Sequence, residues 1–310
     1  MPSFAHSFLL KTLYKICSTL PNPTILSKYL INSPIQRVDT EGVIESIDAL
    51  AVEEPLEIVL AFGEGNHRKR QSISITMRTP TGNDFELALG FLLTEGIIKN
   101  YKDVISVRYT ASELNETAQL NVVQVDLQPF VKFDAEKLQR HFYTSSSCGI
   151  CGKTSLDMVQ TVANFWINKD IPLVKSAILM NFPEKLRQAQ TVFEATGAIH
   201  AAALFDTEGS LLALREDVGR HNALDKLLGW AMQQQLLPLS DCIVLVSGRS
   251  SFELVQKAMM AGVPILAAVG APSSLAVQLA DENNMTLIGF LKNHRFNVYA
   301  GFERIISCNF

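Results

Sequence analysis

The clearest fold signal lies in the stretch DCIVLVSGRSSFELVQKAMMAGVPILAAV, which spans residues 241–269. The uninterrupted apolar run Cys242–Val246 is typical of a strand that is buried on both faces, and Pro264–Val269 repeats this pattern. Between them, Phe252–Ala261 predicts a helix. A strand, a helix and a second strand in this order indicate a parallel β-α-β unit.

The alternation continues on both sides of this unit. The further elements that we expect are strands at 198–205, 211–215 and 286–290, and helices at 222–232 and 274–281. Because continuous apolar strands alternate with helices, we predict an α/β domain with a mostly parallel sheet that helices cover on both faces.

The N-terminal half has a different pattern, with a helix at 83–96 and strands at 56–62, 72–78, 104–108 and 120–126. This pattern predicts a smaller α+β unit. We therefore divide the chain into an N-terminal extension (1–35), a small α+β domain (36–140), a mobile cysteine loop (141–155) and the α/β domain (156–310).

Composition excludes several classes of protein. The 310 residues carry a formal net charge of -4 without a basic stripe, which argues against a nucleic-acid-binding protein. No stretch reaches the 18 or so apolar residues of a membrane span. Five cysteines at irregular spacing do not make a disulfide scaffold, so we expect a reducing, cytoplasmic location. Cys242, which opens an apolar strand, is expected to be a buried core thiol.

Cys148 and Cys151 form the close cysteine pair of the chain. Gly149 and Gly152 leave the backbone around them uncovered, and Lys153 favours thiolate over thiol by lowering a thiol pKa from about 8.5 to roughly 7. A thiolate on an exposed loop suits nucleophilic sulfur chemistry, in which sulfur is accepted as a persulfide and passed on.

Three other interpretations of the pair fit less well. A structural zinc site needs a second pair of ligands, which is missing. A thioredoxin-like redox pair would follow a strand, and the polar lead-in Thr144–Ser147 is a poor strand. A phosphate-binding P-loop would have Gly where Ser147 stands.

Two polar clusters fall where predicted strands end and helices begin. The run Ser247-Gly248-Arg249-Ser250 suits an anion, because free backbone N–H groups lie beside an Arg; the alternative is a tight turn with an exposed Arg. The run Arg215–Asn222 contains Arg220 and His221, which suit a phosphate or a guanine edge; a capping motif with a solvated ion pair explains this run equally well.

Several motifs of the chain, in this order, resemble the FdhD family, the formate dehydrogenase accessory sulfurtransferases. They are FLLTEGII (91–98), CGICGK (148–153), GAIHAAALF (197–205), REDVGRHNALDK (215–226), SGRSSFE (247–253) and APSSLA (271–276). The likeness covers residues 36–306.

The resemblance implies a function. The family carries sulfur from a cysteine desulfurase to the molybdenum cofactor, bis-molybdopterin guanine dinucleotide, so that formate dehydrogenase becomes active. Cys148 then corresponds to the persulfide-bearing residue, and Cys151 supports it. A homodimer is also implied, and GDP is expected to mimic a fragment of the cofactor.

The resemblance also places the cofactor-binding stretch after the last strand of the C-terminal domain. Its residues are Phe290, Leu291, Lys292, Asn293, His294 and Arg295.

The larger domain of the family is similar to the cytidine deaminase fold. Zinc deaminases need H-x-E followed later by P-C-x-x-C. Here Ala202 lies two residues after His200, and the cysteine pair precedes that His. We therefore expect neither zinc nor deamination. A non-catalytic carrier or chaperone of the molybdenum cofactor is the alternative to a sulfurtransferase.

Overall fold

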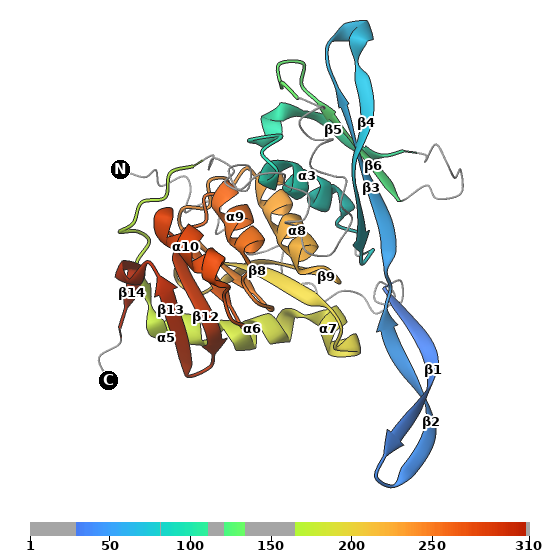
Figure 1. The fold of residues 1–310 in the computed structure, drawn as a ribbon, viewed down its shortest axis with the longest axis vertical. Coiled ribbons are helices and arrows are strands. Elements are labelled where there is room, and N and C mark those ends of the chain that lie inside the picture. The colour runs from blue at the N-terminus through green and yellow to red at the C-terminus, as the bar shows by residue number, and fades with distance from the viewer. Residues whose placement is uncertain (1–28, 81, 111–120, 134–164, 308–310) are drawn as a thin grey trace.

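The computed structural model describes residues 29–80, 82–110, 121–133 and 165–307. Its C-terminal half is built on a six-stranded sheet in the order β13-β12-β11-β10-β8-β9 (Figure 1). The strands are β8 (His200–Asp206), β9 (Leu211–Asp217), β10 (Cys242–Val246), β11 (Ile265–Ala268), β12 (Thr286–Lys292) and β13 (Arg295–Ala300).

Helices cover both faces of this sheet (Figure 1). One face carries α8 (Arg220–Gln233), α9 (Phe252–Met260) and α10 (Ser274–Glu282), and the other carries α5 (Ser176–Met180), α6 (Phe182–Ala189) and α7 (Thr191–Thr196). Alternate residues of a strand point to opposite faces, so Val244 packs with the first group and Ile243 with the second. The predicted α/β class and the helices on both faces are confirmed.

The prediction of a mostly parallel sheet is wrong. The β10–β11 and β11–β12 pairs are parallel, whereas β8–β10, β8–β9 and β12–β13 are antiparallel. Short connections cause two of these antiparallel pairings, β8–β9 and β12–β13. The turn Asp206–Ser210 joins β8 to β9, and Asn293–His294 joins β12 to β13, and a connection this short can only return an antiparallel neighbour.

The small N-terminal unit has a four-stranded sheet in the order β4-β3-β6-β5, with α3 packed on it. Its elements are β3 (Glu54–Phe62), β4 (Lys69–Arg78), α3 (Asp84–Thr94), β5 (Val104–Tyr109) and β6 (Val122–Leu127). Helix α3 lies between this sheet and α8 (Figure 1). One continuous hydrophobic core joins the four-stranded sheet, α3 and the α8–α10 layer of the larger half.

Two glycines let α3 and α8 approach closely. A Cβ atom on Gly90 would lie 1.8 Å from the carbonyl oxygen of Asp225, and a Cβ atom on Gly229 would lie 1.8 Å from that of Glu86. No larger residue fits at this crossing without moving a helix. The contact holds the small unit against the helix that begins with Arg220 and His221.

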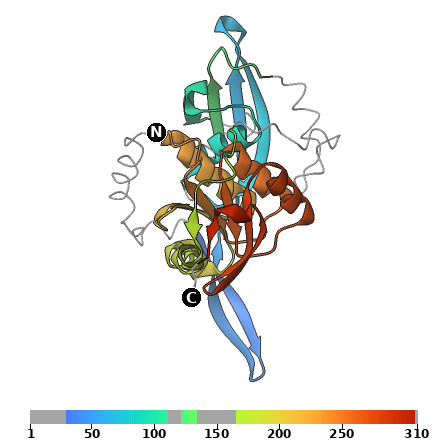
Figure 2. The ribbon, with the colours of Figure 1, turned by 90° about the vertical axis from the view of Figure 1, so that its left-hand side faces the viewer.

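A two-stranded hairpin precedes the small unit. β1 (Leu30–Asp39) pairs with β2 (Gly42–Ala51), and Asp39 Oδ1 accepts hydrogen bonds from the N–H groups of Glu41 and Gly42 in the tight turn. The hairpin projects from one end of the molecule and the β3–β4 hairpin from the other (Figure 2). β1 begins at Leu30 and crosses the boundary predicted at residue 35; the domain division itself stays a prediction.

The last strand closes the α/β domain. β14 (Ile305–Ile306) pairs in parallel with β7 (Val174–Lys175). The fully buried Arg304 donates hydrogen bonds to the carbonyl oxygens of Ile171 and Asn284. Over the described ranges, no helix has both the length and the apolar character that crossing a membrane requires.

Candidate functional site

Polar side chains gather at the end of the six-stranded sheet where β10 ends and β8 begins. There Val246 pairs with Ala202, and His200 pairs with Asp217 at the end of β9. Helices α8 and α9 both begin at this end of the sheet. We call the polar side chains between their first turns the α8–α9 cluster: His200, Arg220, His221, Ser250, Ser251 and Glu253.

Asp217 fixes the start of α8. Its Oδ1 accepts hydrogen bonds from the Gly219 N–H at 2.8 Å and from Asn222 Nδ2 at 3.1 Å. Its Oδ2 accepts from the Thr79 N–H at 3.2 Å and pairs with Lys226 Nζ at 2.6 Å. Asp217 and Asn222 therefore shape the turn before α8 and set the positions of Arg220 and His221. The interpretation as a capping motif with a solvated ion pair was wrong, because the Asp217–Lys226 pair is fully buried and the N-cap residue Gly219 makes no side-chain capping bond.

The start of α9 is fixed by backbone hydrogen bonds. The Ser250 N–H donates to Ala271 O at 3.2 Å, and Ser250 O accepts from the Ser273 N–H at 3.1 Å. Ser251 occupies the N-cap position of α9, but its side chain makes no capping hydrogen bond. At the same position of α10, Ser273 Oγ does accept from the Ala276 N–H.

Four side-chain atoms of the α8–α9 cluster are buried without a hydrogen-bond partner: Arg220 Nε, His221 Nε2, Ser250 Oγ and Ser251 Oγ. Leaving such an atom unpaired costs about 1–3 kcal/mol, so a group of them calls for an explanation. Each of these groups can donate a hydrogen bond, given the appropriate His tautomer. The arrangement suits an anionic ligand with several acceptor oxygens.

The charges around the two histidines favour their neutral forms. Burial, followed by the nearby Lys257 and Arg220 cations, lowers the pKa of His221 to about 4. Burial and Arg220 also lower the pKa of His200. Glu253 acts in the opposite direction on His221, because its Oε2 lies 3.9 Å from His221 Nε2. At neutral pH both imidazoles are uncharged and Arg220 supplies the positive charge.

The predicted Ser247–Arg249 group borders this cluster. Ser247 Oγ accepts a hydrogen bond from the Ala201 N–H at 2.9 Å, so that hydroxyl is used in the sheet. A Cβ atom on Gly248 would lie 3.4 Å from His200 Nδ1, which places the backbone of this loop against the imidazole. Arg249 is exposed and packs beside Gly270.

The stretch from Phe290 to Arg295 was predicted to lie after the last strand, and this prediction is wrong. β12 continues to Lys292 and β13 begins at Arg295, because the two strands form a hairpin. The Phe290 N–H donates to Gly270 O at 3.0 Å, which connects the start of this stretch to the loop that holds Ser250.

The side chains of the stretch have different environments. Leu291 is fully buried in the core. Lys292, Asn293, His294 and Arg295 are exposed at the hairpin end.

The cysteine pair, Cys148 and Cys151, lies outside the described residues, so its role stays a prediction. Cys242 is buried, as predicted, and burial together with Asp241 and Asp206 raises the pKa of its thiol to about 12. A thiol with that pKa is a poor nucleophile at neutral pH. Within the described ranges, no group of three or more His, Cys, Asp or Glu side chains is arranged to hold a metal ion.

Three members of the cluster were not among the predicted binding residues: His200, Ser251 and Glu253. The spacing Ser250-x-x-Glu253 is that of a capping box, which predicts hydrogen bonds within the helix start. The structure shows Ser250 Oγ and Ser251 Oγ unpaired instead. The sequence signal for these residues was a pair of serines before a helix, and such a pair is compatible both with helix capping and with ligand binding.

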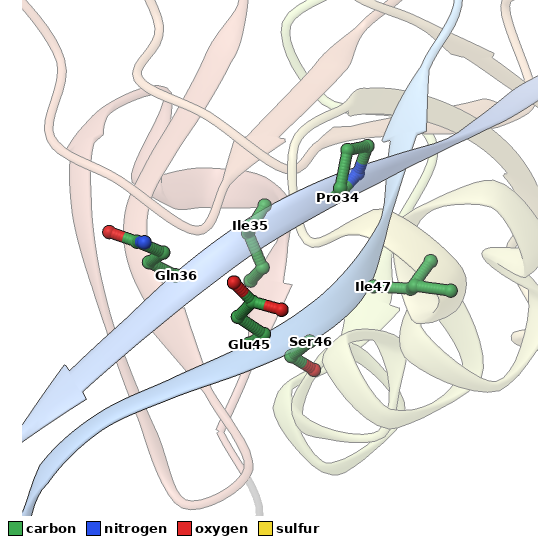
Figure 3. A pocket seen from close by; sticks show the side chains of 6 residues that line it. All are labelled: Pro34, Ile35, Gln36, Glu45, Ser46 and Ile47. Carbon is green, nitrogen blue, oxygen red and sulfur yellow. The ribbon is translucent and has the colours of Figure 1, made fainter.

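A concavity of about 500 Å³ lies elsewhere, on the β1–β2 hairpin (Figure 3). Its lining residues all come from the two hairpin strands: Pro34, Ile35, Gln36, Glu45, Ser46 and Ile47. Glu45 is the one ionisable residue among them, so this surface suits packing against a partner more than chemistry.

Comparison with known proteins identifies a family that shares this sequence. A family model described as the FdhD/NarQ family matches residues 51–306. A relative from Mycolicibacterium paratuberculosis, named sulfur carrier protein FdhD, is 51% identical over 259 residues, covering 83% of this chain and 92% of the relative. A relative of the same name from Sulfurisphaera tokodaii is 42% identical over 271 residues, covering 87% and 96%.

A solved structure shares the fold. The crystal structure of a candidate formate dehydrogenase accessory protein from Desulfotalea psychrophila superimposes with a TM-score of 0.70 at 23% identity, covering 90% of this chain and 100% of that one. The family model and the relatives cover the motifs of both halves, so the chain belongs to the FdhD/NarQ family.

Proposed function

We propose that this protein is a sulfurtransferase that serves formate dehydrogenase. It accepts sulfur from a cysteine desulfurase as a persulfide on Cys148 and delivers it to the molybdenum cofactor, bis-molybdopterin guanine dinucleotide. The observation that carries the proposal is the family match over residues 51–306, together with relatives named sulfur carrier protein. The C-x-x-C pair supplies the chemistry.

Sulfur loading is a balanced exchange. The Cys148 thiolate attacks the outer sulfur of the desulfurase persulfide, and a new S–S bond forms at Cys148. The S–S bond of the donor breaks, and the desulfurase cysteine leaves as a thiolate. No external oxidant or reductant takes part. Lys153 favours the attacking thiolate, and Cys151 supports Cys148 in the relay.

The described part of the chain supports a nucleotide-bearing acceptor. The α8–α9 cluster offers unpaired hydrogen-bond donors, and Ser247, Gly248 and Arg249 border it. Phe290 joins the same loops through Gly270, and Lys292, Asn293, His294 and Arg295 extend the polar surface, while Leu291 supports it from the core. Deamination is not part of this proposal, since Ala202 stands where that chemistry needs a Glu.

Intact-protein mass spectrometry tests the proposal directly. After incubation with a cysteine desulfurase and cysteine, we expect one added sulfur on wild type, located on Cys148, and none on Cys148→Ala. Formate dehydrogenase matured with Cys148→Ala should be inactive although GDP still binds. Active enzyme under those conditions would favour the alternative, a non-catalytic carrier or chaperone of the cofactor.

We also propose that the protein is a homodimer. The β1–β2 hairpin supports this, because a two-stranded ribbon is marginal on its own. It exposes large aliphatic side chains on both faces, with Ile47 70% exposed on one face and Ile44 59% exposed on the other. A second copy that covers one face of the hairpin would bury the aliphatic side chains on that face. The oligomeric state of the full chain in solution tests this proposal.

A further inference from the structure

Large apolar side chains lie exposed on the α/β domain around β7 and β14. They come from two segments of the chain, residues 166–173 and residues 302–306, and we call them the Trp166 patch. Its members are Trp166, Ile171, Leu173, Phe302 and Ile306. Trp166 is 79% exposed and Phe302 62% exposed. Exposed apolar side chains that gather in this way are typical of a surface that binds another protein.

Arg304 holds the two segments of the patch together. Its side chain is fully buried, and it donates hydrogen bonds to the carbonyl oxygens of Asn168 and Ile171. The same guanidinium donates to Asn284 O and, at 3.0 Å, to Thr286 Oγ1 at the start of β12. The backbone beneath the patch is therefore fixed before any partner arrives, which lowers the entropy cost of binding.

The pairing of β7 with β14 directs part of the patch outward. Ile305 pairs with Val174, and both side chains pack in the hydrophobic core that the sheet shares with α5 and α6. Because alternate residues of a strand point to opposite faces, the flanking Leu173 and Ile306 lie on the solvent side, where both are exposed. The inward residues stabilise the fold, whereas the outward ones are available for a partner.

The patch lies where the chain enters the α/β domain from the cysteine segment. Residues 134–164, which contain Cys148 and Cys151, are outside the described part of the chain, and the description resumes at Phe165, directly before Trp166. Phe165 follows Cys148 by 17 positions, so the Cys148 sulfur stays within about 60 Å of this point. A protein that binds the patch is thereby kept within reach of Cys148.

From these observations we infer that the Trp166 patch is the docking surface for the protein that donates sulfur to Cys148. This inference rests on the proposed function and adds the surface by which the donor is recognised. The donor must bring its own persulfide sulfur to bonding distance of Cys148, so loading requires contact between two proteins. The acceptor of the sulfur is a polar, nucleotide-bearing cofactor, which an apolar patch does not suit.

The composition of the patch is that of a small protein–protein interface. An aromatic anchor at the centre with a polar margin is the usual arrangement. Trp166 and Phe302 supply the aromatic rings. The exposed charged residues beside them in sequence form the margin: Lys169, Asp170, Lys175 and Glu303.

The patch is separate from the surface of the proposed dimer. β14 lies on the opposite side of the molecule from the β1–β2 hairpin (Figure 1). Donor docking and dimer formation can therefore be tested independently.

Sulfur loading of the full chain from two donors tests the inference. One donor is a cysteine desulfurase supplied with cysteine, which must dock. The other is glutathione persulfide, a small molecule that needs no docking surface. In both exchanges the Cys148 thiolate attacks the outer sulfur of the donor, the S–S bond of the donor breaks, and the donor leaves as a thiolate.

We expect Trp166→Ala and Phe302→Ala each to raise the desulfurase concentration that gives half-maximal loading by roughly 10-fold, because each removes an aromatic anchor. Loading from glutathione persulfide should not change. Phe130→Ala is the matched control, since Phe130 is 67% exposed after β6 in the small N-terminal unit. This variant should load like wild type from both donors.

Three results would overturn the inference. The first is loading of Trp166→Ala and Phe302→Ala from the desulfurase at the wild-type concentration. The second is an equal loss of loading from both donors, which would mean that the substitutions disturb Cys148 and not docking. The third is conversion of dimer to monomer in these variants, measured by light scattering, which would assign the patch to a second copy of the chain.

The two donors also separate this inference from the proposed function. Wild type that takes sulfur from neither donor contradicts both proposals. Wild type that is loaded by both donors, with Trp166→Ala and Phe302→Ala unaffected, contradicts the docking surface alone.

Discussion

Lys226 Nζ lies 2.6 Å from Asp217 Oδ2, and neither side chain has any exposed surface. This ion pair connects α8 to the end of β9, and Lys226 also donates to the carbonyl oxygen of Thr79 in the small N-terminal unit at 3.0 Å. One buried pair therefore ties together the two halves of the protein and the turn that presents Arg220 and His221.

Replacing Lys226 with Met should destabilise the protein by about 3–5 kcal/mol, because it leaves Asp217 buried without its counter-charge. Urea unfolding followed by circular dichroism measures the loss. The control is Arg108→Gln, which breaks an ion pair of Arg108, a residue with 52% side-chain exposure, and should cost only about 0–1 kcal/mol. Equal costs for the two variants would contradict the structural importance of the buried pair.

The depressed pKa of His221 predicts how stability depends on pH. The unfolded chain takes up this proton near pH 6.5, whereas folded His221 takes it up at about 4, because burial and the neighbouring Lys257, Arg220 and His200 oppose its charge, while Glu253 favours it. Since the unfolded state binds more protons in this window, stability should fall as pH drops from about 6.5 to about 4, by roughly 1–3 kcal/mol.

Denaturant titrations at several pH values, with wild type and His221→Gln side by side, measure this effect. The variant cannot be protonated at this position, so its stability should fall less between pH 6.5 and 4.5. Parallel profiles would show that His221 does not titrate as its surroundings indicate.

At the crossing of α3 and α8, we expect a Gly→Ala substitution to destabilise the protein, although helix propensity alone would predict stabilisation. Gly→Ala within a helix normally stabilises by about 1 kcal/mol. At Gly229, however, the new Cβ would lie 1.8 Å from the carbonyl oxygen of Glu86, so the helices must separate. Gly229→Ala should lower the melting temperature of the full chain; an unchanged or higher value would contradict the close crossing.

The sequence predicted the elements that have an uninterrupted or cleanly alternating apolar pattern, such as β10 and β4, and missed the β1–β2 hairpin, whose pattern is mixed. Cys242–Val246 was predicted with its observed bounds, because five consecutive apolar residues in a buried strand leave little ambiguity. The β1–β2 hairpin was missed, since its apolar residues lie on both faces and follow no simple alternation.

The candidate site was predicted in part for a related reason. Arg220 and His221 were identified as a polar run before a helix, but sequence could not separate them from Asp217 and Asn222, which form the turn. That separation depends on contacts with Met77 and Thr79, more than a hundred residues away along the chain. Long-range pairing of this kind leaves no local pattern.

Cys242 should take no part in sulfur transfer. Because burial raises the pKa of its thiol to about 12, native protein should not be alkylated by iodoacetamide at this position, whereas urea-unfolded protein should be. Peptide mass spectrometry distinguishes the two. Cys242→Ala should retain sulfur loading on Cys148. A loss of loading in folded Cys242→Ala would assign this thiol a role that its burial argues against.

The hairpin predicts which surface forms the proposed dimer. Ile47 and Val43 lie on one face of β2, 70% and 60% exposed, and pair across the ribbon with Pro34 and Val38. Replacing Ile47 and Val43 together with Glu should place charges inside the interface and convert the dimer to a monomer, as measured by light scattering after gel filtration.

Ile75→Glu is the matched control, because Ile75 is 71% exposed on the β4 strand of the other projecting hairpin. A dimer that survives the β2 substitutions but dissociates in Ile75→Glu would assign the interface to β3–β4. Survival in both would show that the exposed aliphatic residues of the two hairpins do not hold the subunits together.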